Sequence, residues 1–165
     1  MLLDDLESEP KATVAWLERI YRREAGRKNF SHDLAEAVAS GSPALERGGA
    51  WMLRRLVAEK GSLSATDWEL VVDGLEGVRS WLARLELCQL LAGHPEMTDA
   101  APEAVAVFLR ECAAGTNVFV RAWGVTAFHS LGKRHRAYRA EAKRSVAKAR
   151  KDPAKSVQAR LRHLT

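Results

Sequence analysis

The sequence is poor in cysteine and has no long apolar run. Only two cysteines, Cys88 and Cys112, occur among 165 residues, and they form no Cys-x-x-Cys pair. We therefore expect two reduced core thiols in a cytoplasmic protein. The densest apolar stretches, such as 104–109, are far shorter than the roughly 20 residues of a membrane helix. The N-terminal residues also lack the basic and apolar segments of a signal peptide, so no association with a membrane is expected.

Motifs for catalysis and metal binding are scarce as well. The sequence contains no P-loop and no GxGxxG, GxSxG or HExxH pattern. His129 and His135 are spaced wrongly for one metal-binding face of a helix. The acidic residues between Asp67 and Glu76 could serve acid–base catalysis, but helix capping explains them more simply. We expect no enzymatic activity, no cofactor and no metal site.

Helical periodicity runs through almost the whole chain, and no strand-like alternation interrupts it. Hydrophobic residues make up 47% of the chain and charged residues 28%, which suits one folded domain of this length. Ser42-Pro43 is typical of a helix start, and Thr66-x-x-Glu69 predicts a capping box. Helices are predicted over residues 10–25, 31–39, 42–59, from 66 onward, 76–92, 102–114, 117–132, 135–150 and 153–164.

Short segments recur along the chain at intervals of about 40 residues. Val78-Arg79-Ser80-Trp81 reappears as Val120-Arg121-Ala122-Trp123. Trp51, Trp81 and Trp123 fall at similar places in these segments. Tryptophans could stack nucleic-acid bases or grip a peptide, but a repeated position in the core between repeats is the simpler interpretation.

The segment Val120-Arg121-x-x-Gly124-x-x-Ala127-Phe128-x-x-Leu131 resembles the second helix of a HEAT repeat, and Asp152-Pro153 resembles the turn that often precedes that helix. The resemblance implies an all-α, armadillo-like αα-superhelix. It would contain about four helical hairpins and an N-terminal capping helix in a single domain, 1–165. Because one hairpin cannot bury its own apolar face, stacked hairpins share a core, and Gly124 would permit close helix approach. The best matches cover residues 66–92, 101–132 and 135–164.

Charge is divided unevenly along the chain. Residues 1–120 hold 13 Lys/Arg and 19 Asp/Glu, a net charge of −6, whereas residues 121–165 hold 13 against 2, a net charge of +11. Such a basic segment is either a solvated helix face or a surface that meets anions. Arg79 and Arg121 are alternatively expected to bond helix ends or acidic neighbours. The candidate anion- or partner-binding residues are Arg121, Arg134, Arg136, Arg139, Lys143, Arg144, Lys148, Lys151, Arg160 and Arg162.

Two functions agree with these patterns. The first is a small cytoplasmic scaffold or adaptor, monomeric or homodimeric, that binds a protein partner, an acidic one among the candidates, on a curved surface. The alternative is binding of nucleic acid through its phosphates by residues 121–165, with a steep dependence on salt. In fold and basicity alone, the chain is similar to HEAT-like DNA-alkylation-repair proteins. No catalytic residue is carried over from them, because fold alone does not determine function.

Overall fold

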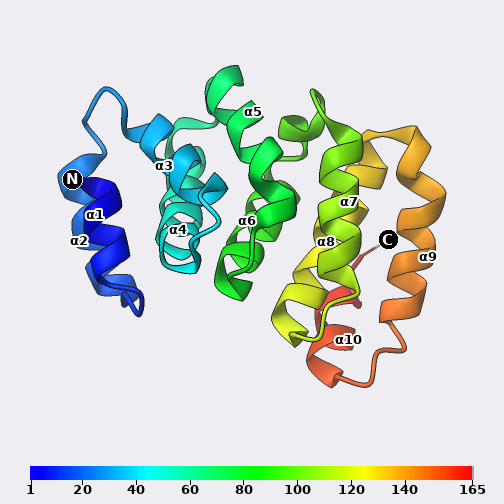
Figure 1. The fold of residues 1–165 in the computed structure, drawn as a ribbon. Helices are drawn as coiled ribbons and strands as arrows, with labels where there is room; N and C mark the ends of the chain where they lie inside the picture. Colours follow the sequence, from blue (N-terminus) through cyan, green and yellow to red (C-terminus); the bar gives the residue numbers. More distant parts are fainter. Residues whose placement is uncertain (165) are drawn as a thin grey trace. The chain divides into compact units, whose positions relative to one another are not determined.

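The structure, a computed structural model, describes residues 1–164, and those residues form helices and no strands (Figure 1). About 77% of the residues are helical, so the prediction of an all-α protein is confirmed. The chain divides into two compact units, Met1–Glu86 and Leu87–Thr165, which we call unit 1 and unit 2 and describe separately. The α-helices are α1 (Leu2–Ser8), α2 (Val14–Glu24), α3 (Phe30–Ala39), α4 (Pro43–Lys60), α5 (Ala65–Gly74), α6 (Trp81–Gly93), α7 (Pro102–Ala113), α8 (Val118–Arg134), α9 (Arg139–Ala149) and α10 (Lys155–Leu161).

Unit 1 is built around α3, which packs against both α4 and α5. Leu34 and Val38 on α3 and Met52 on α4 are completely buried. Gly49 lets the two helices approach closely, because a Cβ atom there would lie 2.7 Å from the Cβ of Ala37. Unit 1 thus has its own apolar core beneath helices with charged outer faces.

Unit 2 is built around α8, which packs against α7, α9 and α10. A Cβ atom on Gly124 would lie 2.7 Å from the backbone nitrogen of Ala113 and 2.9 Å from the carbonyl carbon of Cys112. No side chain fits in that space, so the glycine permits the contact between α7 and α8. The prediction that Gly124 allows close helix approach is confirmed.

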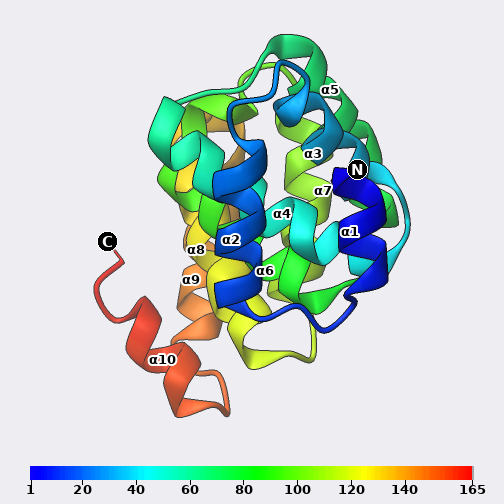
Figure 2. The ribbon, with the colours of Figure 1, turned by 90° about the vertical axis from the view of Figure 1, so that its left-hand side faces the viewer.

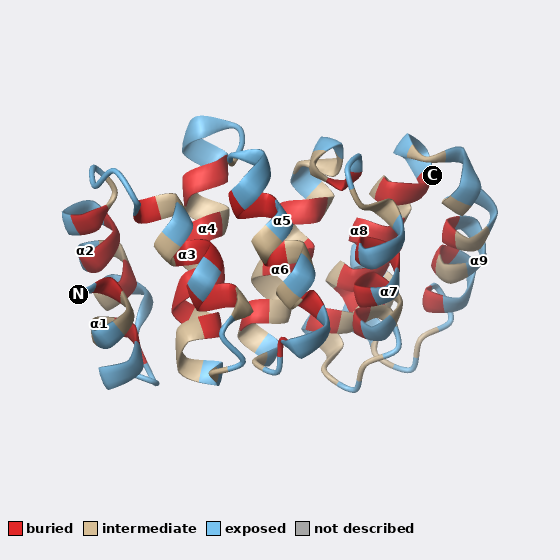
Figure 3. Cartoon of the chain, turned by 45° about the horizontal axis from the view of Figure 1, so that its top comes forward, coloured by how far each residue is buried: buried red, intermediate tan, exposed pale blue. Residues whose placement is uncertain are grey.

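Helices α8, α9 and α10 enclose the C-terminal core of unit 2. It includes Val125 from α8, Val146 from α9, and Val157 and Leu161 from α10. Val157 and Leu161 are both completely buried. Figure 2 shows α10 as the last helix before the C-terminus. Figure 3 shows buried residues along one side of α9 and exposed residues along the other, so α9 presents a long polar face.

Several helix boundaries differ from the predictions. The expected helix 10–25 is shorter and begins at Val14, because the Thr13 side chain accepts a hydrogen bond from the Trp16 amide and caps it. The separate helix α1 precedes it and was not predicted. The predicted capping box at Thr66 is wrong. Ser64 is the N-cap of α5 and accepts a hydrogen bond from the Asp67 amide, while Thr66 is exposed in the first turn.

The proposed equivalence of the tryptophan segments is also wrong. Val78, Arg79 and Ser80 precede α6, whereas Val120 and Arg121 lie within α8. Trp81 is the first residue of α6 and is 45% exposed, because no earlier turn of the helix covers it. Trp123 is partly buried, with Arg160 over its ring. The two tryptophans therefore do not occupy one repeated core position.

Candidate anion-binding groove

The ten predicted binding residues fall into two groups, those with partners and those without. Arg121, Arg134 and Arg160 make ion pairs or ring contacts. The others are exposed and make no ion pair or hydrogen bond within residues 1–164. These unpaired cations are Arg136, Arg139, Lys143, Arg144, Lys148, Lys151 and Arg162.

Arg121 is held in place by the fold of unit 2. Its Nε and Nη2 atoms donate to the two carboxylate oxygens of Asp152 at 2.6 and 2.9 Å. Its Nη1 atom donates to the carbonyl oxygens of Gly115 and Thr116. The hydrogen bonds from Arg121 lower the pKa of Asp152. The expectation that Arg121 bonds a helix end and an acidic neighbour is thus confirmed, whereas the Arg79 side chain is exposed.

Two other predicted residues are engaged on the surface of unit 2. Arg134 forms a two-pronged ion pair with Asp99. The guanidinium carbon of Arg160 lies 3.2 Å from the centre of the Trp123 ring, a cation–π contact between α10 and α8. Burial lowers the pKa of Arg160. These two side chains therefore have local structural partners.

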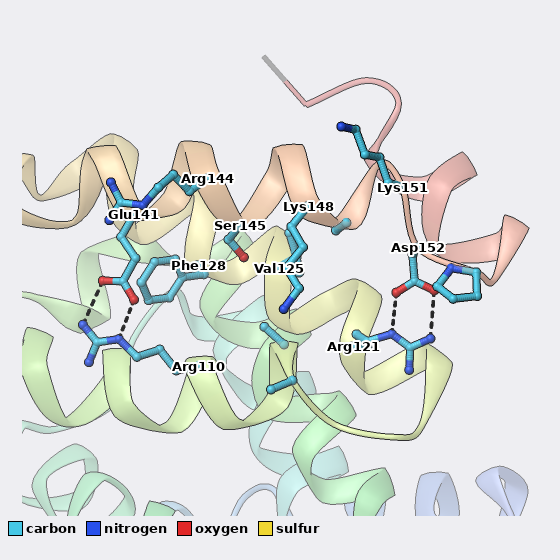
Figure 4. Close-up of a pocket in the computed structure, with 14 residues that line it drawn as sticks. Arg110, Arg121, Val125, Phe128, Glu141, Arg144, Ser145, Lys148, Lys151 and Asp152 are labelled. Atoms are coloured by element: carbon cyan, nitrogen blue, oxygen red, sulfur yellow. Dashed lines mark hydrogen bonds and ion pairs between the residues drawn. The ribbon is translucent and has the colours of Figure 1, made fainter.

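A groove of about 610 Å³ lies between α9 on one side and α7 and α8 on the other (Figure 4). Five basic and two acidic side chains line it, so its net charge is +3. The groove is lined by Arg110, Ala113, Ala114, Arg121, Val125, Phe128, Glu141, Arg144, Ser145, Lys148, Ala149, Lys151, Asp152 and Pro153.

Two arginine–carboxylate pairs bridge this groove (Figure 4). Besides Arg121–Asp152, Arg110 donates to both oxygens of Glu141 at 2.7 and 2.9 Å. Hydrogen bonding from Arg110 lowers the pKa of Glu141, and hydrogen bonding to Glu141 raises the pKa of Arg110. Sequence analysis missed Arg110. Arg110 precedes Glu141 by 31 residues, the same separation as between Arg121 and Asp152, and this was the feature of the sequence that could have indicated it.

The remaining polar groups of the groove have no protein partner within residues 1–164. Figure 4 shows Lys148 and Ser145 pointing from α9 into the space between the two ion pairs. Arg144 lies beside Glu141 and contributes to the low pKa of that carboxyl group. We call Arg144, Lys148 and Lys151 the groove cations. Within residues 1–164 none of the three forms an ion pair, and Lys148 is the one that points into the space between the arginine–carboxylate pairs (Figure 4).

A second polar cluster, in unit 1, has the composition of a catalytic triad but a different geometry. Ser31 Oγ donates to Asp67 Oδ2 at 2.8 Å, and His32 Nδ1 lies 3.0 Å from Asp67 Oδ1. Serine and histidine thus share one carboxylate, and the serine is not bonded to the histidine as a nucleophile requires. Burial raises the pKa of Asp67, but hydrogen bonds from Ser31, His32 and Ser64 outweigh it and lower the pKa. The cluster ties α3 to α5.

Other chemistry-bearing residues of the described part are dispersed or enclosed. Cys88 and Cys112 are both reduced and completely buried, as predicted for core cysteines. Within residues 1–164, no three histidine, cysteine or acidic side chains are grouped so that they could hold a metal ion. None of the described helices combines the length and the apolar character needed to cross a membrane.

Comparisons with known proteins add no relative. Neither the protein-family models, nor the curated proteins, nor the solved structures contain a match to this chain.

Proposed function

We propose that the chain is a non-catalytic binding module of HEAT-like helical hairpins that binds nucleic acid through its phosphates. The surface concerned is the exposed side of α9 and of the short 3₁₀ helix η3 (Arg136–Tyr138) before it. We call Arg136, Arg139 and Lys143 the outer stripe. Within residues 1–164 all three are exposed and unpaired, and this observation carries the proposal.

The outer stripe has the properties of a surface that follows phosphates. Its members are three and four residues apart, which places them on one side of the helical segment. Lysine and arginine on such a face neutralise phosphates and release counterions, without reading base sequence. Because no described carboxylate competes for these side chains, their charge is available to a polyanion.

The HEAT-like arrangement is part of the same proposal. Consecutive helices pack in pairs, α3 with α4 and α7 with α8, as helical hairpins do. The Val120-Arg121 segment lies in the helix that the resemblance indicates, and Arg121 is bonded to the turn that contains Asp152. These contacts support a stack of hairpins within unit 2.

Direct binding measurements test the proposal. We expect the chain to bind random-sequence duplex DNA and RNA with a Kd of about 1–100 µM near physiological salt, as sequence-independent binders do. Replacing Arg136, Arg139 and Lys143 by glutamate should weaken binding at least tenfold. It should also reduce the slope of log K against log salt by about 2–3, since each phosphate contact contributes roughly 0.9.

A matched variant distinguishes the effect of the outer stripe from the effect of net charge alone. Lys11, Arg19 and Lys28 are exposed in unit 1 and are unpaired within the described residues. Replacing these three by glutamate changes the net charge equally and should leave the Kd within about twofold. Equal losses for the two triple variants, or no binding by the unaltered chain at low salt, would refute the proposal.

A second candidate function is the adaptor that binds an acidic protein. The observation that favours it is the exposure of large apolar side chains in unit 2, Val107 at 44% and Phe119 at 57%. Protein interfaces combine such apolar contacts with complementary charge. Poly-L-glutamate is the probe for this alternative. If it competes with DNA for the outer stripe at equal charge concentration and binds more tightly, the acidic protein partner becomes the better proposal.

A further inference from the structure

We infer that the groove of unit 2 binds an organic phosphate of nucleotide size. This inference goes beyond the interface with a nucleic-acid backbone, because it uses different side chains. The outer stripe is not part of the groove lining, whereas the groove cations Arg144, Lys148 and Lys151 are.

The acidic side chains of the groove do not repel an anion as free carboxylates would. Glu141 is bonded through both oxygens to Arg110, and Asp152 through both oxygens to Arg121. Such two-pronged pairs are geometrically fixed and electrically neutral. What they leave on the lining is the net charge of +3 of the groove cations, of which Lys148 points into the space between the ion pairs and Lys151 points away from it (Figure 4).

Lys148 and Ser145 form the centre of the proposed phosphate site. They lie one helical turn apart on α9 and point into the space between the two ion pairs (Figure 4). Neither side chain makes a hydrogen bond to the described part of the chain. An ammonium and a hydroxyl group side by side donate to different oxygens of one phosphate, and Arg144 adds charge one turn away.

The rest of the groove predicts an apolar body on the ligand. Ala113, Ala114 and Pro153 supply carbon surface beside the charged groups, above the buried side chains of Val125 and Phe128. A bare inorganic ion would leave this surface uncovered, whereas a flat ring system would lie against it. The volume of about 610 Å³ is within the range of small-molecule sites, roughly 300–1,000 Å³. A phosphate attached to a flat apolar ring is the chemistry of a nucleotide.

Two sources supply this chemistry, a free nucleotide and the phosphorylated end of a strand. Titration calorimetry of the full chain at low salt distinguishes them. The probes are ADP, adenosine, inorganic pyrophosphate, and one short single strand with either a 5′-phosphate or a 5′-hydroxyl group. We expect ADP to bind more tightly than pyrophosphate and adenosine. Tighter binding of the 5′-phosphorylated strand than of both the 5′-hydroxyl strand and ADP would assign the site to strand ends. Equal binding of the two strands, with binding of ADP, would assign it to free nucleotides.

Variants of single side chains locate the site. Lys148→Gln and Ser145→Ala should each weaken ADP binding, the former at least about tenfold, because a charged hydrogen bond is lost. Lys155→Gln removes the same charge from an exposed residue of α10 outside the groove and should leave the Kd within about twofold. Thermal unfolding checks that each variant is folded.

The outcomes separate this inference from the proposed function. The triple glutamate variant of the outer stripe should lose DNA binding and retain ADP binding, whereas Lys148→Gln should show the reverse. Equal effects of Lys148→Gln and Lys155→Gln on the ADP Kd would overturn the groove site, as would absence of ADP binding at millimolar concentration. Neither result would by itself affect the interface of the outer stripe.

Discussion

The two units of the chain use arginine differently. Unit 1 holds 12 basic and 15 acidic residues, a net charge of −3, and most of its arginines are bonded within the unit. Arg54 pairs with Glu86, and Arg55 pairs with both Glu18 and Glu59. Unit 2 holds 14 basic and 6 acidic residues, a net charge of +8. Its surplus is concentrated on α9, where the cations are unpaired within the described residues.

This difference distinguishes cations that are paired with carboxylates inside a unit from cations that are unpaired and exposed. In unit 1, arginines connect neighbouring helices and are neutralised by carboxylates. In unit 2, Arg110, Arg121 and Arg134 are likewise paired with carboxylates, and Arg160 lies over the Trp123 ring. The outer stripe and the groove cations are left to solvent or to a ligand. We propose that the unpaired cations of unit 2 serve a partner, and the following predictions test this division between paired and unpaired charge.

The largest effect is expected from removing a structural carboxylate. Asp152→Ala leaves Arg121 without its partner at a site where the two side chains are only 9% and 19% exposed, and it removes the hydrogen bond to the Ala154 amide. We expect a loss of about 2–3 kcal/mol in the free energy of unfolding, measured with urea. Asp99→Ala, which frees the exposed Arg134, should change stability far less. Equal losses for the two variants would contradict the distinction between structural and surface pairs.

The next effect concerns helix packing in unit 2. Gly124→Ala places a Cβ atom 2.7 Å from the backbone of Ala113, so α7 and α8 must move apart. A loss of about 1–3 kcal/mol is expected from such overpacking. Gly93 has no atom within 4 Å of its Cβ position, so Gly93→Ala should cause no loss. Thermal and urea unfolding provide the measurement, and a tolerated Gly124→Ala would show that the helices are not packed this closely.

A smaller effect is expected where α10 meets α8. Arg160→Gln removes the cation from the face of the Trp123 ring. The free energy of unfolding should fall by about 0.5–1 kcal/mol, as for exposed cation–π contacts, and tryptophan fluorescence should change. Lys155→Gln removes an exposed charge from the same helix and should alter neither property. A loss of the same size in this control would mean that net charge, and not the ring contact, is responsible.

The smallest effect distinguishes one histidine in each unit. A hydrogen bond to Asp67 raises the pKa of His32. The contribution of His32 to the free energy of unfolding is therefore complete below about pH 6.5 and is lost as the pH rises through the raised pKa. Burial, with Lys133 and Arg150 nearby, lowers the pKa of His129. The contribution of neutral His129 to the free energy of unfolding is therefore present above about pH 6.5 and is lost as the pH falls through the lowered pKa. NMR titration should show His32 titrating at the higher pH. The opposite order would refute both assignments.

Local periodicity predicted most of unit 2 but less of unit 1. The helix expected at 102–114 is found at Pro102–Ala113, because an apolar face at helical spacing and an N-terminal proline define it locally. Helix α1 and the break before α2 were not predicted, because a helix of seven residues is too short to show a clear period of apolar side chains. Ser64 rather than Thr66 caps α5, since both are good cap residues and only the helix start decides between them.

The candidate site was predicted in part. The sequence indicated the cations of α9, because their number and spacing are visible along one segment. Arg110 was not identified with them, because that residue lies on another helix and its partner Glu141 is 31 residues away. Ion pairs between helices depend on how the helices pack, and the spacing of residues along one helix does not show which helices pack together.

The amino-acid sequence by itself determined that the chain is helical, that its cysteines lie in the core and that its positive charge gathers near the C-terminus. These follow from composition and from periods of a few residues. Only the tertiary structure decided which cations are neutralised and which are available, and that Lys148 and Ser145 point into a groove between two ion pairs. Such facts depend on distances between helices, which the burial of apolar side chains sets for a whole unit at once.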